Sequence, residues 1–357
     1  MWSPRAPHGR HGSSAPFRRY GAPCFPLGRA PHSLHQRGHV TKPAASRIWL
    51  NGRLLPSDGP HISAYDRGFQ LGDAVFEAFR ARRGVAIELD GHLARLHRSL
   101  AAMAIEMPFE DDAISAGISE LLASIGWDGI EPPGDAAIRL MVSRGFDATR
   151  GVMPHPGGTA SVVIQAWPFN PPAAATLEKG LRVVTSVIRR DPSSPMSGIK
   201  TTARAELVYA RIEADRAGAD DAIFLTTDGR LTEATTSNIL LIRGGVCATP
   251  RLGTALLAGT ARAWLVEHGG SAGLRTVEQD LRLEDAFAAD EAAICSSIAG
   301  VVPVVAVDGR PIGAGLPGPL TMALRAAREN WIDAHSLEVA GARALAASAG
   351  GERPDRR

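Results

Sequence analysis

One lysine near the middle of the chain has the chemistry of a covalent catalyst. Of the 39 lysine and arginine residues only three are lysines, Lys42, Lys179 and Lys200. Lys200 lies in Gly198-Ile199-Lys200-Thr201-Thr202, between a predicted turn and a predicted helix. A lysine amine that loses its proton can attack a carbonyl group and form a Schiff base, whereas arginine stays charged. The alternative is a solvated surface lysine, and the residue type alone leaves both open.

Three further segments carry groups that suit a bound cofactor. Glu233 lies between two predicted strands, where a carboxylate could pair with a protonated heterocyclic nitrogen; the alternative is a turn carboxylate facing water. Thr260 follows Gly259 at the start of a predicted helix, where free N–H groups and a hydroxyl suit a phosphate, although a plain helix cap has the same pattern. Ser296 and Ser297 end a predicted strand and offer further hydroxyls.

The elements that must position these residues follow from hydrophobic periodicity. Asn51-Gly52 after an apolar run is a strong hairpin signal. Apolar residues three and four apart from 92 to 107 predict an amphipathic helix. The pattern predicts strands at 47–50, 74–80, 85–89, 136–143, 160–167, 181–188, 222–226, 239–242, 246–249, 292–296 and 301–307, and further helices at 112–125, 202–217 and 260–268.

The composition along the chain predicts two domains. Residues 46–167 form a small N-terminal α/β domain and 177–334 a larger C-terminal domain, joined by a linker at 168–176 that begins with three prolines in five positions. Residues 1–45 lack hydrophobic periodicity and are expected to be a disordered leader or an upstream mis-called start. The tail 335–357 is rich in alanine and glycine and is expected to fray.

Charge and composition argue against several classes of protein. Residues 1–49 carry eight basic and no acidic residues, so the remaining chain has 31 basic and 37 acidic residues and predicts no nucleic-acid partner. No apolar run approaches the roughly 20 residues of a membrane span. Cys24, Cys247 and Cys295 are too scattered for a disulfide framework or a zinc site, so we expect a cytoplasmic protein without a metal.

The chemical segments together resemble one enzyme family. The blocks Asp66-Arg67-Gly68-Phe69-Gln70-Leu71-Gly72-Asp73-Ala74-Val75-Phe76-Glu77, His92-Leu93-Ala94-Arg95-Leu96, Gly198-Ile199-Lys200, Leu231 to Ile239, Gly259-Thr260-Ala261-Arg262 and Cys295-Ser296-Ser297 occur in this order over residues 47 to 330. They are similar to the class IV, or fold type IV, pyridoxal-phosphate enzymes, which include branched-chain and D-amino-acid aminotransferases and aminodeoxychorismate lyases.

The resemblance implies a fold, a cofactor and a set of roles. It implies an α/β (α+β) protein whose larger domain has a barrel-like strand core, and a homodimer whose sites are completed by the partner. Lys200 would bind pyridoxal 5′-phosphate covalently and move the substrate proton. Glu233 would hold the pyridine nitrogen protonated, and Arg95, Thr260 and Ser297 would bind the phosphate.

The resemblance is less specific about the substrate. It implies an amino acid, either branched-chain or L-glutamate, and a 2-oxo acid as the reacting pair; the alternative is an aminodeoxychorismate lyase that releases pyruvate. The Tyr that branched-chain enzymes have five residues after the lysine is Ala205 here, and the histidine of the D-amino-acid enzymes would fall at Val152. The residues expected to face the substrate are Phe76, Arg80, Arg139, Arg144 and Arg150, with Arg144 equally suited to capping a turn.

Overall fold

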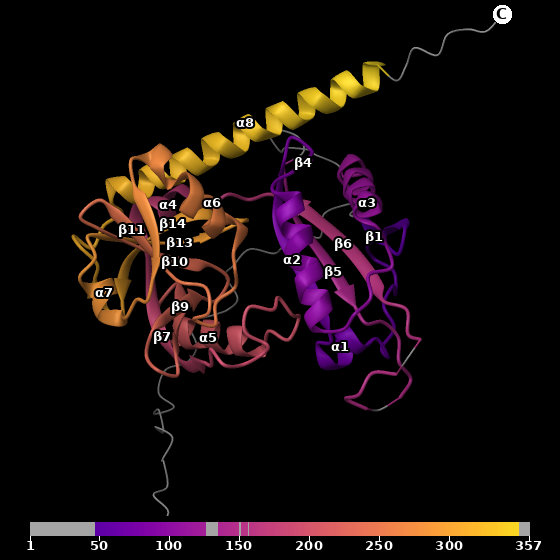
Figure 1. Cartoon of the computed structure of the whole chain (residues 1–357), viewed down its shortest axis with the longest axis horizontal. Coiled ribbons are helices and arrows are strands. Elements are labelled where there is room, and N and C mark those ends of the chain that lie inside the picture. The colour runs from indigo at the N-terminus through magenta and orange to yellow at the C-terminus, as the bar shows by residue number, and fades with distance from the viewer. Residues whose placement is uncertain (1–46, 126–134, 150, 156, 350–357) are drawn as a thin grey trace, which may run out of the picture. The chain divides into compact units, whose positions relative to one another are not determined.

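The structure is a computed structural model that describes residues 47–125, 135–149, 151–155 and 157–349 (Figure 1). In the last helix, side chains are described as far as Ala342. The predictions for residues 1–45, for Arg150 and for the end of the tail lie outside the described residues. No helix in the described part of the chain is long and apolar enough to span a membrane.

The N-terminal half is built on a six-stranded antiparallel sheet. Its strand order is β2-β1-β6-β5-β3-β4. The bounds are Arg47–Leu50 (β1), Arg53–Pro56 (β2), Ala74–Arg82 (β3), Val85–Ala86 (β4), Ala136–Ser143 (β5) and Ser161–Pro168 (β6). The predicted Asn51-Gly52 hairpin is confirmed: both residues have positive φ, 47° and 83°, as a two-residue turn of the hairpin type requires.

Two helices cover one face of this sheet, as Figure 1 shows for α2. Helix α2 (Leu89–Ala102) and helix α3 (Asp111–Ala123) contribute Leu93, Leu96, Leu100, Ile114, Ile118 and Leu121 to a core that they share with Trp49, Val75 and Phe79 of the sheet. The predicted strand 85–89 ends at Ala86, because Glu88 adopts a positive φ of 55° and the chain turns directly into α2. Helix α2 therefore begins three residues earlier than predicted.

Successive side chains of β3 lie on opposite faces of the sheet, one toward α2 and one away from it. Glu77 and Phe79 face α2, where each contacts His92. Phe76 lies on the opposite face because successive strand residues point to opposite sides. Arg139 shares that opposite face, since it is paired with Ala78 in the neighbouring strand β5.

The C-terminal half contains a closed barrel. Six strands follow one another in the order β10-β13-β14-β7-β8-β9, and β9 pairs with β10 to complete the ring. Their bounds are Leu181–Arg190 (β7), Asp221–Thr226 (β8), Leu231–Ala234 (β9), Asn238–Arg243 (β10), Glu291–Ser296 (β13) and Gly300–Val307 (β14). The expected barrel-like strand core is confirmed, and it is filled by aliphatic side chains such as Val183, Ile223 and Ile239.

Shorter elements complete the described chain. Strands β11 (Val246–Pro250), β12 (Arg275–Gln279) and β15 (Arg310–Pro311) extend the sheet beyond the ring. The shorter helices are α1 (Arg67–Leu71), α4 (Ala174–Lys179), α5 (Ala205–Arg216), α6 (Thr260–His268) and α7 (Leu283–Phe287), with a 3-10 turn at Gly269–Ala272. Helix α4 begins inside the predicted linker 168–176. The hydrophobic pattern missed β9 because it has only four residues, and β12 because it is largely polar.

A long helix ends the described chain. Helix α8 runs from Pro319 to Ala349, whereas the sequence predicts a frayed tail from His335 (Figure 1). Leu324, Arg328, Ile332 and Ser336 are buried at steps of four residues, so one stripe of the helix packs against the protein. Two members of this stripe are polar, which is why apolar periodicity did not indicate this helix.

Candidate active site

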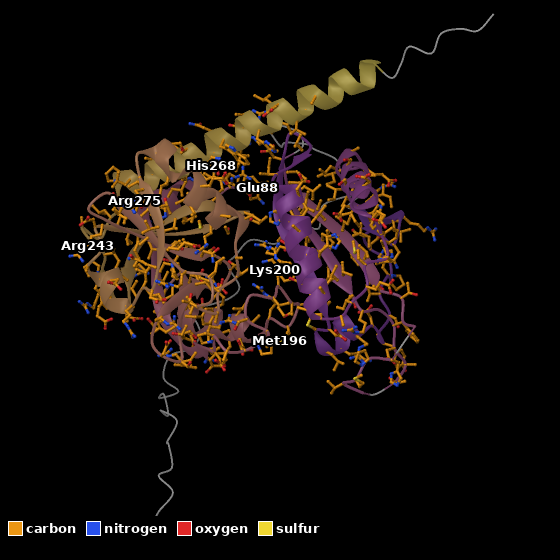
Figure 2. All side chains as sticks on the ribbon, in the orientation of Figure 1. Glu88, Met196, Lys200, Arg243, His268 and Arg275 are labelled. Carbon is orange, nitrogen blue, oxygen red and sulfur yellow. The ribbon has the colours of Figure 1, made fainter. Side chains whose placement is uncertain are left out.

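Lys200 lies on the segment between β7 and α5, which is held against strand β3. The backbone N–H of Phe76 donates to the carbonyl of Lys200 at 3.0 Å, and Thr202 N–H donates to the carbonyl of Ala74 at 2.9 Å. The Lys200 Nζ then lies 4.8 Å from the centre of the Phe76 ring. Figure 2 shows Lys200 beside helix α2. The lysine is thus fixed by main-chain bonds that do not depend on its own side chain.

The environment of Lys200 makes its amine reactive. Burial, together with the nearby charges of Arg95 and Arg204, lowers the pKa of Lys200 from 10.5 to about 8. Glu77 and Glu233 act in the opposite direction but do not restore the ordinary value. A pKa of about 8 leaves about a tenth of the amine unprotonated at pH 7, whereas an ordinary lysine has less than about a thousandth in that form.

We expect the reaction of Lys200 with the aldehyde of pyridoxal phosphate to accelerate with pH. Only the free amine attacks a carbonyl, so the rate rises through a midpoint of about 8 and then levels off. Stopped-flow absorbance across the range from about pH 6 to about pH 10 measures it. Lys179→Ala, at an exposed lysine, is the control and leaves the profile unchanged. A midpoint near the ordinary value of 10.5 would contradict the burial described for Lys200.

Glu233 lies in β9, close to the point where the barrel closes. Its Oε2 accepts a hydrogen bond from Leu257 N–H at 3.0 Å, which fixes the direction of the carboxylate. Burial raises the pKa of Glu233, and the positive charges of Arg190, Lys200 and Arg204 oppose that rise. A carboxylate in such surroundings gains most from a cationic partner, and a protonated pyridine nitrogen is such a partner.

The three predicted phosphate ligands are brought together from distant parts of the chain. The hydroxyls of Thr260, at the start of α6, and Ser297, after β13, lie 2.7 Å apart. Arg95 of α2 donates to the carbonyl of Ala258 at 2.7 Å, which ties its guanidinium to the turn before Thr260. A guanidinium, two hydroxyls and a helix N-terminus at one place are groups suited to binding an anion.

Gly259 allows this turn to pass close to Asn238. A Cβ at position 259 would lie 2.1 Å from the Asn238 Oδ1, and Asn238 Nδ2 donates to Leu257 O at 3.0 Å. Any side chain at 259 must therefore displace the turn that carries Thr260. Only glycine fits at this position of the turn. A close approach of the backbone is also what a phosphate held by backbone N–H groups requires.

Gly259→Ala is expected to weaken cofactor binding about 10- to 100-fold. The reason is the displacement of the Thr260 N–H and hydroxyl, and a hydrogen bond to a charged group contributes about 1.5–3 kcal/mol. An absorbance titration with pyridoxal phosphate gives the dissociation constant. Gly270→Ala serves as the matched control because a Cβ there meets open space. Equal affinities for the two variants would show that the turn does not hold the phosphate.

Two residues without a sequence-derived role support the phosphate site. Glu77 and His92 are both fully buried, and the Glu77 carboxylate accepts from Arg95 through two bonds of 2.8 and 2.6 Å. His92 Nδ1 lies 2.7 Å from the same carboxylate. The spacing of His92 could have indicated its role, because His92 and Arg95 are three residues apart and share one helix face.

Arg204 is a further residue that sequence reasoning missed. Its guanidinium lies 5.2 Å from the centre of the Phe76 ring, and that of Arg139 lies 4.1 Å from the same ring. Neither arginine has a carboxylate within ion-pair distance in the part of the chain that the structure describes. Burial lowers the pKa of both, and each raises the local positive potential around the Phe76 ring.

The other predicted substrate residues are engaged elsewhere. Arg80 is buried, and its Nη1 bonds both oxygens of Glu329 in α8, at 2.9 and 3.0 Å. Arg144 bonds both oxygens of Asp73 and the carbonyls of Met103 and Ala104. Arg144 uses most of its donors on these partners, whereas Arg80 is held in its ion pair through Nη1 and its Nε has no partner among the described residues. Arg150 lies outside the described residues.

The residues present fit pyridoxal phosphate. A buried amine of lowered pKa, a carboxylate directed by Leu257 N–H, and an anion site built on Arg95 and Thr260 match the aldehyde, the ring nitrogen and the phosphate of that molecule. A closed barrel, together with these three groups from both halves of the described chain, is the arrangement expected of a pyridoxal-phosphate enzyme.

Comparison with known proteins identifies the family. The family model "Amino-transferase class IV" matches residues 74–307. A putative branched-chain-amino-acid aminotransferase of Methanocaldococcus jannaschii is 32% identical over 280 residues, 78% of this chain and 94% of the relative. A D-alanine aminotransferase of Bacillus licheniformis is 31% identical over 286 residues, 80% and 97%.

Solved structures agree with the sequence comparison. The branched-chain aminotransferase of Thermoproteus uzoniensis, crystallised with norvaline, superposes with a TM-score of 0.71 at 27% identity, covering 80% of this chain and 95% of that one. Another similar structure is that of a branched-chain amino acid aminotransferase with pyridoxamine 5′-phosphate. The chain therefore belongs to aminotransferase class IV and is a pyridoxal-phosphate enzyme, as its relatives of that class are.

Proposed function

We propose that the enzyme transfers an amino group between an amino acid, either a branched-chain L-amino acid or L-glutamate, and a 2-oxo acid. The observation that carries this proposal is the surroundings of the Phe76 ring. The Lys200 amine lies 4.8 Å from the ring centre, and the Arg139 guanidinium lies 4.1 Å from it. Met141 is paired with Phe76 and adds apolar surface to the same sheet face. An apolar face suits a hydrocarbon side chain, and an adjacent guanidinium suits a carboxylate.

The residues around the cofactor divide the work of transamination. When bound, pyridoxal phosphate supplies a pyridinium ring that accepts the electron pair left on the substrate Cα after deprotonation. Lys200 removes the proton from Cα and returns it at the cofactor's C4′. Glu233 holds the ring nitrogen protonated, and Arg95, Thr260 and Ser297 hold the phosphate so that the ring cannot shift between the two half-reactions.

A second candidate, an aminodeoxychorismate lyase, is favoured by one observation. Arg139 and Arg204 approach the same ring from segments far apart in the sequence, and Arg204 stands next to Ala205, where branched-chain enzymes have a tyrosine. Aminodeoxychorismate carries two carboxylates, so two guanidinium groups that pair with no carboxylate of the described chain would suit it. The reaction releases pyruvate and stores no amino group on the cofactor.

An absorbance titration separates the candidates. The protein is loaded with pyridoxal phosphate and then mixed separately with L-leucine, L-glutamate and D-alanine. Bleaching of the cofactor band by L-leucine or L-glutamate supports the proposed transaminase. Bleaching by D-alanine alone shifts the assignment to D-amino acids. If none of the three bleaches the band and added aminodeoxychorismate yields pyruvate, the lyase replaces the proposal.

Arg139→Met is expected to raise the KM for L-glutamate about 10- to 100-fold and to change that for L-leucine by less than about threefold. The distal carboxylate of glutamate loses a charged hydrogen bond of about 1.5–3 kcal/mol, whereas leucine has no such group. Steady-state kinetics with both donors give the ratio. Arg53→Met, at an exposed arginine of β2, is the control. An equal loss for both donors would place Arg139 on the carboxylate that all amino acids share.

We also propose that two copies of the chain associate. Phe69, Phe146, Val152 and Met153 are between 57% and 85% exposed. The rings of Tyr65 and Phe146 lie 5.9 Å apart and link the two segments that carry this apolar surface. Contiguous exposed apolar side chains typically mark an interface. Sedimentation should give the mass of a dimer, and Phe69→Glu should increase the dissociation constant at least about tenfold; a monomeric wild type would overturn the assignment.

A further inference from the structure

Beneath the hydroxyls of the phosphate site lies a buried group of three ionisable residues. Glu77, His92 and Arg95 are 0%, 0% and 4% exposed. Arg95 and His92 both bond the Glu77 carboxylate, Arg95 through Nε and Nη2 and His92 through Nδ1. Arg95 faces the phosphate site directly, whereas His92 reaches it only through Thr260.

The pairing fixes the proton positions within this group. Although burial acts to raise it, the hydrogen bonds from Arg95 and His92 hold the pKa of Glu77 at about 2, so the carboxylate only accepts. His92 Nδ1 must then carry a hydrogen. Burial lowers the pKa of His92, which leaves the ring neutral and its Nε2 as an acceptor without a hydrogen.

A chain of hydroxyls points at that acceptor. His92 Nε2 lies 3.2 Å from Thr260 Oγ1, which lies 2.7 Å from Ser297 Oγ. A neutral His92 draws the Thr260 hydrogen toward itself, and the Ser297 hydrogen then turns to the Thr260 oxygen. Each group then donates its hydrogen to the next acceptor, in the order Ser297, Thr260, His92 and Glu77. In this arrangement neither hydroxyl has a hydrogen left for a phosphate oxygen.

We propose that His92 takes up one proton at Nε2 when the phosphate of the cofactor binds, and that this reverses the chain of hydroxyls. The proton comes from solvent, and the two hydroxyls keep their own. The protonated Nε2 then donates to Thr260 Oγ1, Thr260 donates to Ser297 Oγ, and Ser297 turns its hydrogen to the phosphate. His92 is thus a positioning residue for the phosphate site. The inference rests on the proposed roles of Arg95, Thr260 and Ser297.

The charges around His92 favour this protonation once a phosphate is present. Without the phosphate, Arg95 is balanced by Glu77, so the pair presents no net charge to a dianion. The groups that face His92 are Glu77 from β3, Arg95 from its own helix and Glu88 from the turn before it; both carboxylates favour the protonated ring and Arg95 opposes it. Lys200 adds positive charge near Arg95. A phosphate dianion beside Thr260 adds attraction for the imidazolium.

Calorimetric proton counting tests the proposal without catalysis. The ligand is pyridoxine 5′-phosphate, which has no aldehyde and cannot react with Lys200. Titration at about pH 8 in two buffers of different ionisation enthalpy gives the number of protons taken up on binding. The phosphate is already dianionic at that pH, because its second pKa is about 6. Proton exchange at the ring nitrogen is common to all variants and cancels in the differences.

The wild type is expected to take up about one proton more than His92→Gln or His92→Asn. Each amide can donate to Glu77 but neither titrates. Because the complex carries the extra proton, wild-type affinity should also fall relative to the variants as pH rises, by up to about tenfold per pH unit. His97→Gln is the matched control: it lies on the same helix but is exposed and paired with Asp111, and it should count protons like the wild type.

The outcomes distinguish failure of the proposed His92 protonation from failure of the proposed phosphate site. Equal proton counts for the wild type and the folded His92→Gln and His92→Asn variants would overturn the proposed protonation of His92. If pyridoxine 5′-phosphate does not bind the wild type at all, the proposed phosphate site fails instead. A count about one proton higher in the wild type than in the His92 variants, with His97→Gln equal to the wild type, supports the proposed protonation of His92.

Discussion

Replacing Lys200 with alanine is expected to lower the transamination rate by about 10⁴-fold or more and to abolish covalent attachment of the cofactor. A positioned general base contributes about 10²–10⁴-fold, and Lys200 also holds the cofactor before the substrate arrives. Borohydride reduction followed by intact mass measurement shows whether the cofactor is attached. Stopped-flow absorbance with the amino donor gives the rate of the first half-reaction.

The loss should be specific to this lysine. Lys179→Ala changes an exposed lysine just before β7 and is expected to retain wild-type attachment and rate. The main-chain bonds that hold residue 200 against β3 survive the Lys200→Ala change, so a folding defect is not expected. If Lys200→Ala still carried reducible cofactor at one position, another amine would be the nucleophile and the assignment of the site would be wrong.

Replacing Glu233 with glutamine is expected to lower kcat about 10²- to 10³-fold while leaving covalent attachment at Lys200 intact. The amide cannot stabilise a protonated pyridine nitrogen as a carboxylate does, so the ring becomes a weaker electron acceptor, and removal of one preorganised electrostatic partner costs about this much. Glutamine keeps an oxygen to accept the Leu257 N–H, so the local fold is preserved. Single-turnover absorbance measures the step.

Lys200→Ala and Glu233→Gln therefore distinguish covalent attachment of the cofactor from its activation as an electron acceptor. Glu178→Gln, at an exposed glutamate of α4, is the control for the loss of one carboxylate. A Glu233→Gln rate within about threefold of the wild type would show that this carboxylate does not face the ring nitrogen. A restored rate with a cofactor analogue whose ring nitrogen is permanently charged would confirm the role.

The sequence predicted the elements with clear periodicity well and the polar elements poorly. Helix α6 and strand β5 have the predicted bounds, because apolar residues repeat at the expected spacing in both. Strand β4 ended early because a positive φ at Glu88 has no hydrophobic signature. Helix α8 was not predicted, because its buried stripe includes Arg328 and Ser336 and is therefore not purely apolar.

The candidate site shows the same division. Lys200, Glu233, Arg95 and Thr260 were indicated by the resemblance, and the structure brings Arg95, Thr260 and Ser297 to one place. Glu77 and His92 were given no role from the sequence, although His92 lies three residues before Arg95, because their bonds cross a sheet–helix interface. The arginines expected to bind the substrate differ in their partners. Arg80 and Arg144 form ion pairs with Glu329 and Asp73. Arg139 has no carboxylate partner among the described residues.

The closure of the barrel determines when the active site can exist during folding. Strands β7, β8, β9 and β10 pair with near neighbours in the chain, but β14 must find β7 in parallel, with Val304 opposite Leu181. Pairing over such a distance carries a large loop-closure cost and is expected late. Lys200 follows β7, Glu233 lies in β9 and Ser297 follows β13, so we expect these groups to reach their final positions only once the strands of the barrel have paired. Capture of the cofactor at Lys200 would then mark the chains that have completed the barrel, and a misfolded chain that lacks this pairing would keep a lysine of ordinary reactivity.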